Sequence, residues 1–457
     1  MRHLPDLVSP REIVDSGLCI GCGACAAAQM RWDRDGFLKP DESSDAYDTR
    51  SDTFSRQCPF SPAAPNEDAI AAEQFADAPH ADTRIGRFEA AYVGYAREDP
   101  FRRQASSGGM TSWVAAELLR TNMIDAVAHV SPADPQTSGA FFEYRISRSL
   151  EALSAGAKSR YYPIELSRVL AEIRATPGRY AIIGIPCFIK AIHLLRRIDP
   201  VLHERVTHTL GLFCGHMKSA AMVESFAWQL GTEVSRVRAL DYRIKDEHRP
   251  ANWYRAHIEF DDGSSRERDW WHLADGDWGA GFLQNPACDW CDDVVAETAD
   301  ISFGDAWVEP YSSDGRGTNV VIVRTKELKQ LIEVARADGR LELKDVDAEF
   351  IARTQAAGLR HRRDGLAYRL TWRRHGIVPH KRIAPSADLP LRRRLVYRLR
   401  YAIARWSHPI LRLARRLGMP RLYTAWARII LRLYQSLTWS RGWVGKVFDA
   451  LMPQPER

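Results

Sequence analysis

Three closely spaced cysteines constrain the fold of this chain more than any other feature of its sequence. They form the run C-I-G-C-G-A-C, in which two residues separate successive thiols, so one tight loop can direct all three to one point. The glycines of this run, Gly21 and Gly23, permit the backbone angles that such a loop needs. A [4Fe–4S] cluster needs a fourth thiolate, and one cysteine follows in R-Q-C-P-F, before a proline as in ferredoxins. The predicted ligands are Cys19, Cys22, Cys25 and Cys58.

Zinc is the main alternative occupant of this first site. Zinc sites usually combine one C-x-x-C pair with a second pair, whereas this run places three cysteines in sequence. The spacing therefore favours an iron–sulfur cluster over zinc, and a cysteine cluster without metal is the remaining alternative.

The other four cysteines are scattered along the chain. Cys187 and Cys214 follow short apolar runs that are typical of buried strands, A-I-I-G-I-P-C and L-G-L-F-C-G. Cys288 and Cys291 form the pair C-D-W-C. Four such thiols suit a second four-thiolate site. Two ordinary buried cysteines beside an incomplete zinc knuckle would produce the same pattern, and spacing alone does not decide between these interpretations.

Length and composition set the class of protein. The chain has 457 residues, of which 45% are hydrophobic and 27% charged, as expected for a globular protein of two or three domains. No apolar run is long enough for a membrane span, and the N-terminal residues lack the apolar core of a signal peptide. We therefore expect a cytoplasmic protein, in which cysteines stay reduced and bind metal more often than they form disulfides.

Hydrophobic periodicity predicts a mixed α/β fold in three parts. We expect an N-terminal ferredoxin-like [4Fe–4S] segment (residues 1–85) that ends in a linker at Ala69–Thr83, a layered α/β core (86–350) and a helical tail (351–457). The predicted core strands are Ala90–Tyr95, Ala126–Val130, Tyr180–Ile185 and Asn319–Thr325, with further strands in D-Y-R-I-K-D and within 256–271. The predicted core helices are Thr111–Thr121, Ile164–Ala175 and Phe188–Arg197.

The tail differs from the body in charge. Residues 360–457 contain 23 lysines and arginines against four acidic residues, whereas residues 1–359 carry a net charge of −13. Two amphipathic helices, Leu391–Arg416 and one across Leu422–Leu437, place tryptophan, tyrosine and arginine side by side. Such helices bind anionic membrane surfaces peripherally, or pack on an acidic body or a partner subunit. No recognition motif supports nucleic-acid binding.

A glycine-rich turn precedes the first core helix. In S-S-G-G-M-T the glycines permit close approach of a phosphate, and the helix N-terminus offers free N–H groups. The hydroxyl groups add donors, although an ordinary helix cap has the same composition. The candidate residues are Ser106, Ser107, Gly108, Gly109 and Thr111.

These motifs and their order resemble the coenzyme F420 hydrogenase/dehydrogenase beta-subunit family. Members include the beta subunit of F420-reducing hydrogenase and 7-hydroxymethyl chlorophyll a reductase. The resemblance extends from Cys19 to Arg324. Its landmarks are C-I-G-C-G-A-C, S-S-G-G-M-T, G-A-K-S-R-Y-Y, G-I-P-C, L-F-C-G, C-D-W-C, A-D-I-S-F-G-D-A-W and V-I-V-R-T.

The resemblance implies FAD and one or two [4Fe–4S] clusters. By this resemblance the S-S-G-G-M-T turn becomes a flavin site, so that the core would bind FAD. G-A-K-S-R-Y-Y supplies a cation, a hydroxyl group and rings for the flavin, although it could equally be an exposed loop. Lys158, Ser159, Tyr161 and Asn319 thus join the candidate flavin residues. The second cluster would be held by Cys187, Cys214, Cys288 and Cys291.

One departure from the family pattern concerns the substrate. The family often has a tryptophan just before the strand at Asn319, where this chain has Thr318, and Trp307 stands out instead. Asp305 and Arg324 could reach flavin or substrate. They could equally cap a turn and form a salt bridge, respectively.

The predicted function is that of an oxidoreductase that carries electrons between ferredoxin, or a similar donor, and an unidentified small organic substrate. The same components would also permit reverse flow from a reduced deazaflavin such as F420. A non-catalytic electron-transfer subunit of a larger complex is the first alternative. A regulatory or scaffold protein with clusters but without flavin is the second.

Overall fold

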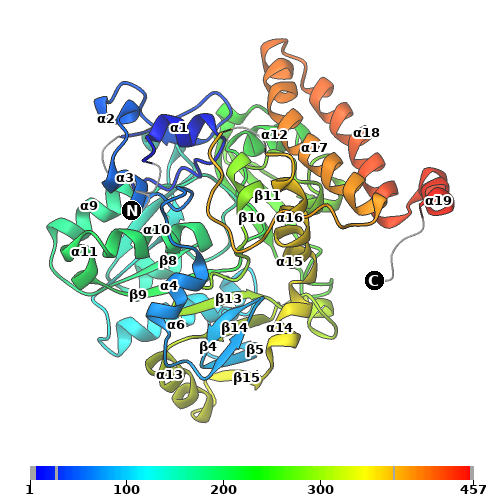
Figure 1. The fold of residues 1–457 in the computed structure, drawn as a ribbon. Helices are drawn as coiled ribbons and strands as arrows, with labels where there is room; N and C mark the ends of the chain where they lie inside the picture. The colour runs from blue at the N-terminus through cyan, green and yellow to red at the C-terminus, as the bar shows by residue number, and fades with distance from the viewer. Residues whose placement is uncertain (1–6, 26–28, 374–375, 453–457) are drawn as a thin grey trace.

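The centre of the molecule is an eight-stranded mixed sheet (Figure 1). The computed structural model describes residues 7–25, 29–373 and 376–452. The strands follow the order β15-β5-β14-β13-β9-β8-β6-β7 across the sheet. Their bounds are β5 (Ala90–Ala96), β6 (Ala126–Pro132), β7 (Phe142–Ser147), β8 (Tyr180–Gly184), β9 (Val206–Leu212), β13 (Ile301–Asp305), β14 (Asn319–Val323) and β15 (Leu341–Asp345).

The strand directions create one functional edge. Strands β6, β8, β9 and β13 run parallel to each other, and β5 shares their direction because both β5 and β13 pair antiparallel with β14. The carboxyl ends of these five strands therefore lie at the same edge. Ligands of open α/β sheets bind outside the carboxyl ends of the parallel strands, so the loops at this edge are where a site is expected.

Alternating side chains cover both faces of the sheet. In β8, Tyr180 and Ile182 pack on one face while Ala181 packs on the other, as the two-residue period of a strand requires. Helices α6 (Met110–Arg120) and α13 (Lys326–Ala337) cover one face, and α9 (Ser167–Ala175), α10 (Pro186–Arg196) and α11 (Pro200–Arg205) cover the other. The predicted core strands and helices are thus confirmed, with shifts of up to three residues at their ends.

A smaller antiparallel sheet lies beside the main one. It comprises β10 (Val237–Ile244), β11 (Arg255–Phe260) and β12 (Ser265–Asp269), where strands were predicted, and it shares a core with α12 (Ala221–Gln229). The remaining short elements of the body are α5 (Phe101–Gln104), α7 (Pro135–Ser138), α8 (Leu150–Ala155), η1 (Val234–Arg236), η2 (Trp270–His272), η3 (Trp278–Ala280), η4 (Pro286–Trp290) and η5 (Tyr311–Ser313).

The N-terminal segment consists of short elements around a loop. Ser9 begins α1 with a capping box, because its hydroxyl group accepts from the Glu12 amide while the Glu12 carboxylate accepts from the Ser9 amide. The elements are α1 (Pro10–Asp15), β1 (Met30–Trp32), β2 (Leu38–Pro40), α2 (Asp45–Asp48), α3 (Asp52–Gln57), α4 (Glu67–Gln74), β3 (His80–Asp82) and β4 (Gly86–Phe88). Residues 1–6, which contribute to the signal-peptide prediction, lie outside the described residues.

The prediction of a linker at Ala69–Thr83 is wrong. Most of α4 lies in this range, and Asn66 caps that helix through its side-chain oxygen. Ile70 is fully buried against Leu194 of α10, which stabilises the helix on the core. The alanine-rich composition suggested a flexible segment, but alanine is also the strongest helix former.

The tail begins as short helices and ends as a long helical hairpin. The short helices are α14 (Ala348–Thr354), α15 (Ala356–Arg362) and α16 (Asp364–Leu370). The hairpin helices, α17 (Leu391–Arg416) and α18 (Pro420–Trp439), confirm the two predicted amphipathic helices, and α19 (Gly442–Leu451) follows them. The hairpin extends beyond the body (Figure 1). No helix within the described residues is long and apolar enough to cross a membrane.

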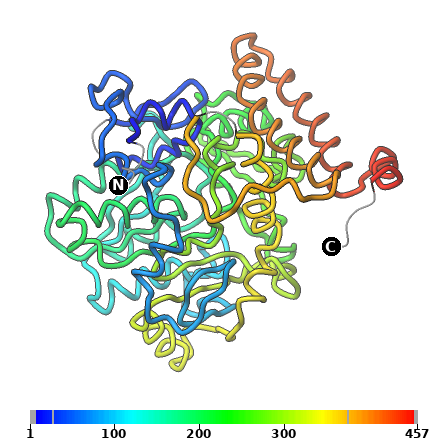
Figure 2. Tube along the Cα trace, viewed as in Figure 1, coloured from blue at the N-terminus to red at the C-terminus, as the bar shows by residue number. Residues whose placement is uncertain are grey.

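The segment between α16 and α17 returns along the N-terminal segment (Figure 2). Arg373 donates to the carbonyl oxygen of Ser16, and the Ile377 amide donates to the Ser16 hydroxyl oxygen. Parts of the chain more than 350 residues apart are therefore joined.

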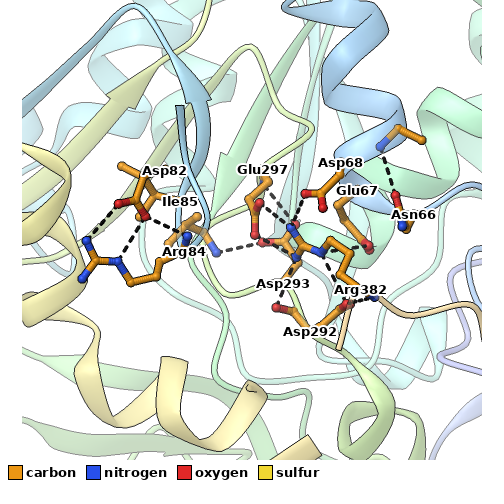
Figure 3. Close-up of polar contacts among 12 residues, drawn as sticks. Asn66, Glu67, Asp68, Asp82, Arg84, Ile85, Asp292, Asp293, Glu297 and Arg382 are labelled. Carbon is orange, nitrogen blue, oxygen red and sulfur yellow. Dashed lines mark hydrogen bonds and ion pairs between the residues drawn. The ribbon is translucent and has the colours of Figure 1, made fainter. Parts of the chain in front are cut away.

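The same segment, between α16 and α17, contributes Lys381 and Arg382 to a buried ion cluster (Figure 3). Arg382 forms two hydrogen bonds of 2.6 and 2.9 Å with Glu297, and it also contacts Asp292 and Asp68. Lys381 pairs with Asp292 at 3.1 Å. Although burial disfavours its charged form, Lys381 and Arg382 hold the pKa of Asp292 well below its ordinary value. The cluster connects α4, the loop that follows Cys291, and the segment before α17.

Candidate functional site

The first four thiols line one pocket in the N-terminal segment. Cys58 caps the C-terminal end of α3, while the other three lie on the loop after α1. Gly21 has φ of +78°, and a Cβ there would lie 2.4 Å from the carbonyl oxygen of Leu38, so only glycine fits. This confirms the conformational role predicted for Gly21. The four thiols belong to Cys19, Cys22, Cys25 and Cys58, and apolar walls come from Ile13, Phe54 and Phe60.

Burial makes the thiols of Cys22, Cys25 and Cys58 weak acids. Burial, with a smaller contribution from the neighbouring thiol of Cys19, raises the pKa of Cys22 to about 12. The pKa of Cys25 is raised by burial and by Cys22, Cys19 and Cys58. Thiols must lose their protons to bind metal. Four buried thiolates would repel each other, so they are stable together only around a cationic centre.

The second four thiols converge at the functional edge of the sheet. Cys187 lies in the first turn of α10 after β8, and Cys214 follows β9. Cys288 lies in η4, and Cys291 caps its end. Burial raises the pKa of Cys187, and the three other thiols of this set raise it further. The apolar runs before Cys187 and Cys214 are thus neighbouring parallel strands, which brings residues 187, 214, 288 and 291 together.

Arg362 of α15 lies beside all four of these thiols. Its guanidinium donates to the carbonyl oxygens of Cys288 at 2.8 Å and Cys291 at 3.3 Å, and also to that of Gly215. The side chain is buried and forms no ion pair with a carboxylate of the described residues. Although burial disfavours its charge, the four thiols raise the pKa of Arg362. An unpaired buried cation is costly, so this arginine indicates an anionic centre at the thiols.

The two sets of thiols adjoin each other. Cys22 of the first set contributes to the raised pKa of Cys187 of the second. Tyr144 of β7 lies near both, because burial raises its pKa and the thiols of Cys187 and Cys22 add to this effect. Its hydroxyl group donates to the carbonyl oxygen of Ile183 at 2.8 Å. Seven of the eight cysteines, all except Cys214, lie in or against one hydrophobic core cluster.

No three histidine, cysteine, aspartate or glutamate side chains within the described ranges are placed to hold a single metal ion.

The predicted flavin residues around the S-S-G-G turn lie together at the same sheet edge. Gly109 has φ of +81° at the N-cap of α6. The side-chain oxygen of Asn319 accepts from the Met110 amide at 3.1 Å, and the Ser106 hydroxyl oxygen accepts from the Ser159 amide at 2.8 Å. The Ser107 hydroxyl group donates to the carbonyl oxygen of Thr318. The described contacts thus bring together Ser106, Ser107, Gly108, Gly109, Ser159 and Asn319.

The other predicted flavin residues are Thr111, Lys158 and Tyr161, and the contacts of Lys158 and Tyr161 are with other parts of the structure. Thr111 is half-buried in the first turn of α6. Lys158 has φ of +96° and pairs with Asp241 of β10. Tyr161 packs among aromatic rings, with its centroid 4.6 Å from that of Trp278.

Two basic residues, Arg243 of β10 and Lys245 just after its end, escaped the sequence analysis. Arg243 pairs with Asp305 at 2.9 Å and lies over the ring of Tyr254. Lys245 donates to the carbonyl oxygens of Arg102 (2.5 Å), Ser107 (2.8 Å) and Arg316 (2.7 Å). Burial lowers the pKa of Lys245 to about 7, and nearby arginines add to this effect. In D-Y-R-I-K-D the two basic residues stand two positions apart, a spacing that a regular strand would put on one face, and this signal could have identified them.

Asp305 lies at the functional edge, whereas Arg324 does not. Asp305 and Asn319 are paired across β13 and β14, but Arg324 follows the opposite end of β14. It donates to the Ser302 hydroxyl oxygen at 2.9 Å and to carbonyl oxygens. The prediction that Arg324 reaches the same site is wrong, because five residues of strand span about 16 Å.

Several buried polar atoms near Tyr161 lack partners. His216 is 3% exposed and stacks on Trp278 with ring centroids 4.3 Å apart. Neither of its ring nitrogens, nor Nε of Arg243, has a hydrogen-bond partner among the described residues. Burial and nearby cations lower the pKa of His216 well below its ordinary value, so the ring is neutral. Buried polar groups normally have partners, so these atoms suit a bound polar molecule.

Comparisons with known proteins give two family matches. Residues 91–171 match the N-terminal model of the coenzyme F420 hydrogenase/dehydrogenase beta subunit, and residues 178–349 match the C-terminal model. Together the models cover more than half of the chain. A chain of the F420-reducing [NiFe] hydrogenase complex from Methanosarcina barkeri is similar in structure, with 18% identity and a TM-score of 0.48. The match covers 64% of this chain and 96% of that one. No curated protein matches the sequence.

Proposed function

Because this chain belongs to the coenzyme F420 hydrogenase/dehydrogenase beta-subunit family, we propose that it is an oxidoreductase that holds two [4Fe–4S] clusters and FAD. This family belongs to redox complexes, which agrees with the predicted class of activity. Two sets of four thiols, the second at the same sheet edge as a Ser/Gly turn, carry the proposal.

The donor sets fit clusters better than single zinc ions. All eight ligand candidates are thiols, and thiolates are the usual ligands of [4Fe–4S] clusters. A cubane binds one thiolate at each of four irons, so its ligands lie farther apart than the four ligands of one zinc ion. The four thiols of the first set share one pocket, as the ligands of a single cluster must. The buried cation of Arg362 balances negative charge at the second set.

Arg362→Gln should lower the reduction potential of one cluster and leave the other unchanged. A cation beside an anionic cluster favours the reduced form, which is more negative, so its loss disfavours reduction. Redox titration followed by electron paramagnetic resonance would resolve the two signals. The matched control is Arg363→Gln, because Arg363 instead pairs with Glu297 at 3.2 Å. Two unchanged potentials in a protein with full iron content would contradict this role.

The Ser/Gly turn and its surroundings fit FAD. Backbone amides at the start of α6 and the hydroxyl groups of Ser106 and Ser107 suit the pyrophosphate. The unpartnered nitrogens of His216 and Arg243 suit the polar edge of the flavin ring. Clusters transfer single electrons, and FAD would couple them to two-electron chemistry on an organic substrate.

Lys245→Met should strongly reduce the FAD content of the purified protein. The ammonium group joins three carbonyl oxygens of the segments that form the turn, so its loss leaves them unpaired and frees the loop. Released flavin would be measured by fluorescence, with iron content as a check on folding. Lys344→Met, on the exposed side of β15, is the control. Full FAD content in both variants would exclude this role for Lys245.

Ferredoxin or a similar donor, and a small organic substrate, remain the proposed partners. Anaerobic purification followed by iron, sulfide and flavin quantification tests the whole assignment. About eight iron atoms and one FAD per chain are expected. About four iron atoms without flavin would favour the alternative, a non-catalytic electron-transfer subunit.

The tail is a proposed attachment to an anionic membrane surface. Trp406 of α17 is 61% exposed and Trp443 of α19 is 76% exposed, among many arginines. Tryptophan and arginine on helices that lie flat are typical of interfacial binding. Co-sedimentation of the protein with anionic rather than neutral phospholipid vesicles would test this proposal, and a partner subunit is the alternative occupant.

A further inference from the structure

An open cleft separates α18 from the edge of the small sheet. Its volume is about 720 Å³, which lies in the range of small-molecule sites. One wall comes from the segments on either side of β11 and β12, and the other from α18 and the residue before α19. None of the residues predicted to bind clusters or FAD lines it. The residues that carry the argument are Trp253, Trp271, Arg428, Arg432 and Arg441.

The sheet wall presents two indole rings. Trp253 is 40% exposed and Trp271 is 50% exposed. Tryptophan is usually well buried, so two half-exposed indoles in one cleft leave substantial apolar surface in water. Their flat faces suit stacking on a planar ring.

The helical wall presents cations without counter-charges. Arg428 and Arg432 lie four residues apart and therefore share one face of α18. Neither forms an ion pair with a described carboxylate, and no acidic residue lines the cleft. The Arg441 guanidinium donates to the side-chain oxygen of Gln435 at 3.3 Å and forms no ion pair with a carboxylate of the described residues. Elsewhere in the tail, by contrast, Arg415 pairs with Glu224.

The helical wall is held in place. The amide nitrogen of Gln435 donates to Asp277 at 3.0 Å, and the Tyr434 hydroxyl group donates to the carbonyl oxygen of Gly279 at 2.8 Å. These bonds attach α18 to the segment around η3. The arginines and indoles thus face each other in a defined geometry before any ligand binds.

We propose that this cleft binds a nucleoside diphosphate, or the equivalent part of a larger nucleotide. Guanidinium groups form paired hydrogen bonds with phosphate oxygens, and three of them match the charge of a diphosphate. The base would stack on Trp253 or Trp271. A neutral or purely apolar ligand would leave the three cations without a partner. The site is independent of the proposed clusters and FAD.

The test is binding of ADP to the full-length holoprotein, measured by calorimetry and by tryptophan fluorescence. The double variant R428E/R432E should weaken ADP binding at least tenfold and leave iron and FAD contents unchanged. Trp271→Ala should also weaken binding and reduce the fluorescence change. The control is Arg416→Glu, which alters an exposed charge on α17 outside the cleft. It should leave ADP affinity unchanged.

Two further probes, pyrophosphate and phospholipid vesicles, distinguish a nucleotide from other phosphate-containing ligands. Pyrophosphate alone should bind at least tenfold more weakly than ADP, because it lacks the base. Equal affinities would overturn the nucleotide assignment, as would equal weakening by Arg416→Glu and R428E/R432E. Vesicles of anionic phospholipid should not displace ADP. Displacement that depends on Arg428 and Arg432 would instead assign the cleft to lipid headgroups. The measured quantity for every variant is its affinity for ADP. These expected results therefore hold even if the FAD assignment is wrong.

Discussion

Cys22→Ser is expected to remove about half of the iron and sulfide, leaving about four iron atoms per chain. Cys22 shares its pocket with Cys19, Cys25 and Cys58, so one missing thiolate leaves a cubane with three ligands. A serine hydroxyl group is a much weaker ligand for iron than a thiolate. Anaerobic purification with iron and sulfide analysis, and the loss of one of two paramagnetic signals, would measure the effect.

Two further variants make this result specific. Cys58→Ser should cause the same half-loss, because Cys58 reaches the pocket from α3 rather than from the loop. Cys214→Ser should remove the other half and the other signal. Full iron content in Cys22→Ser would contradict the first site. A complete loss in every variant would indicate that the two sets fold as one unit around Tyr144.

Arg382→Met is expected to lower the free energy of unfolding by about 3–5 kcal/mol, the usual effect of removing one partner from a buried ion pair. The variant would leave Glu297 and Asp292, both buried, with less positive charge beside them (Figure 3). Because Arg382 also contacts Asp68, the N-terminal segment would lose a contact with the body. Urea unfolding followed by circular dichroism would measure the difference.

The control for this prediction is Arg168→Met. Arg168 pairs with Glu143 at 3.1 Å, but its side chain is mostly exposed. Exposed pairs contribute about 0–1 kcal/mol, so this variant should unfold almost like the unchanged protein. Similar stabilities of the Arg382 and Arg168 variants would show that the buried cluster adds nothing beyond a surface pair.

Much of the fold followed from local patterns. The alternation of apolar residues identified β5, β6, β8 and β14, and the helical period identified α6, α10, α17 and α18. The mixed α/β fold with C-terminal helices and the family resemblance are confirmed. The ferredoxin-like segment, the division at residues 85 and 350, and the cofactor ligands stay predictions. The linker failed because composition does not reveal that Ile70 has a buried partner in α10.

The sequence by itself determined the first thiol site. Cys19, Cys22 and Cys25 lie within one loop, so their proximity depends only on short spacing and on the glycines between them. The spacing of Cys187, Cys214, Cys288 and Cys291 did not group them, and the family resemblance only implied it. The tertiary structure brings them close together and shows Arg362 and Lys245 beside the two candidate sites. Those contacts depend on strand order and on which loops share a sheet edge. The local sequence pattern does not reveal which distant strands and loops become neighbours, because the packing of the whole core determines the strand order.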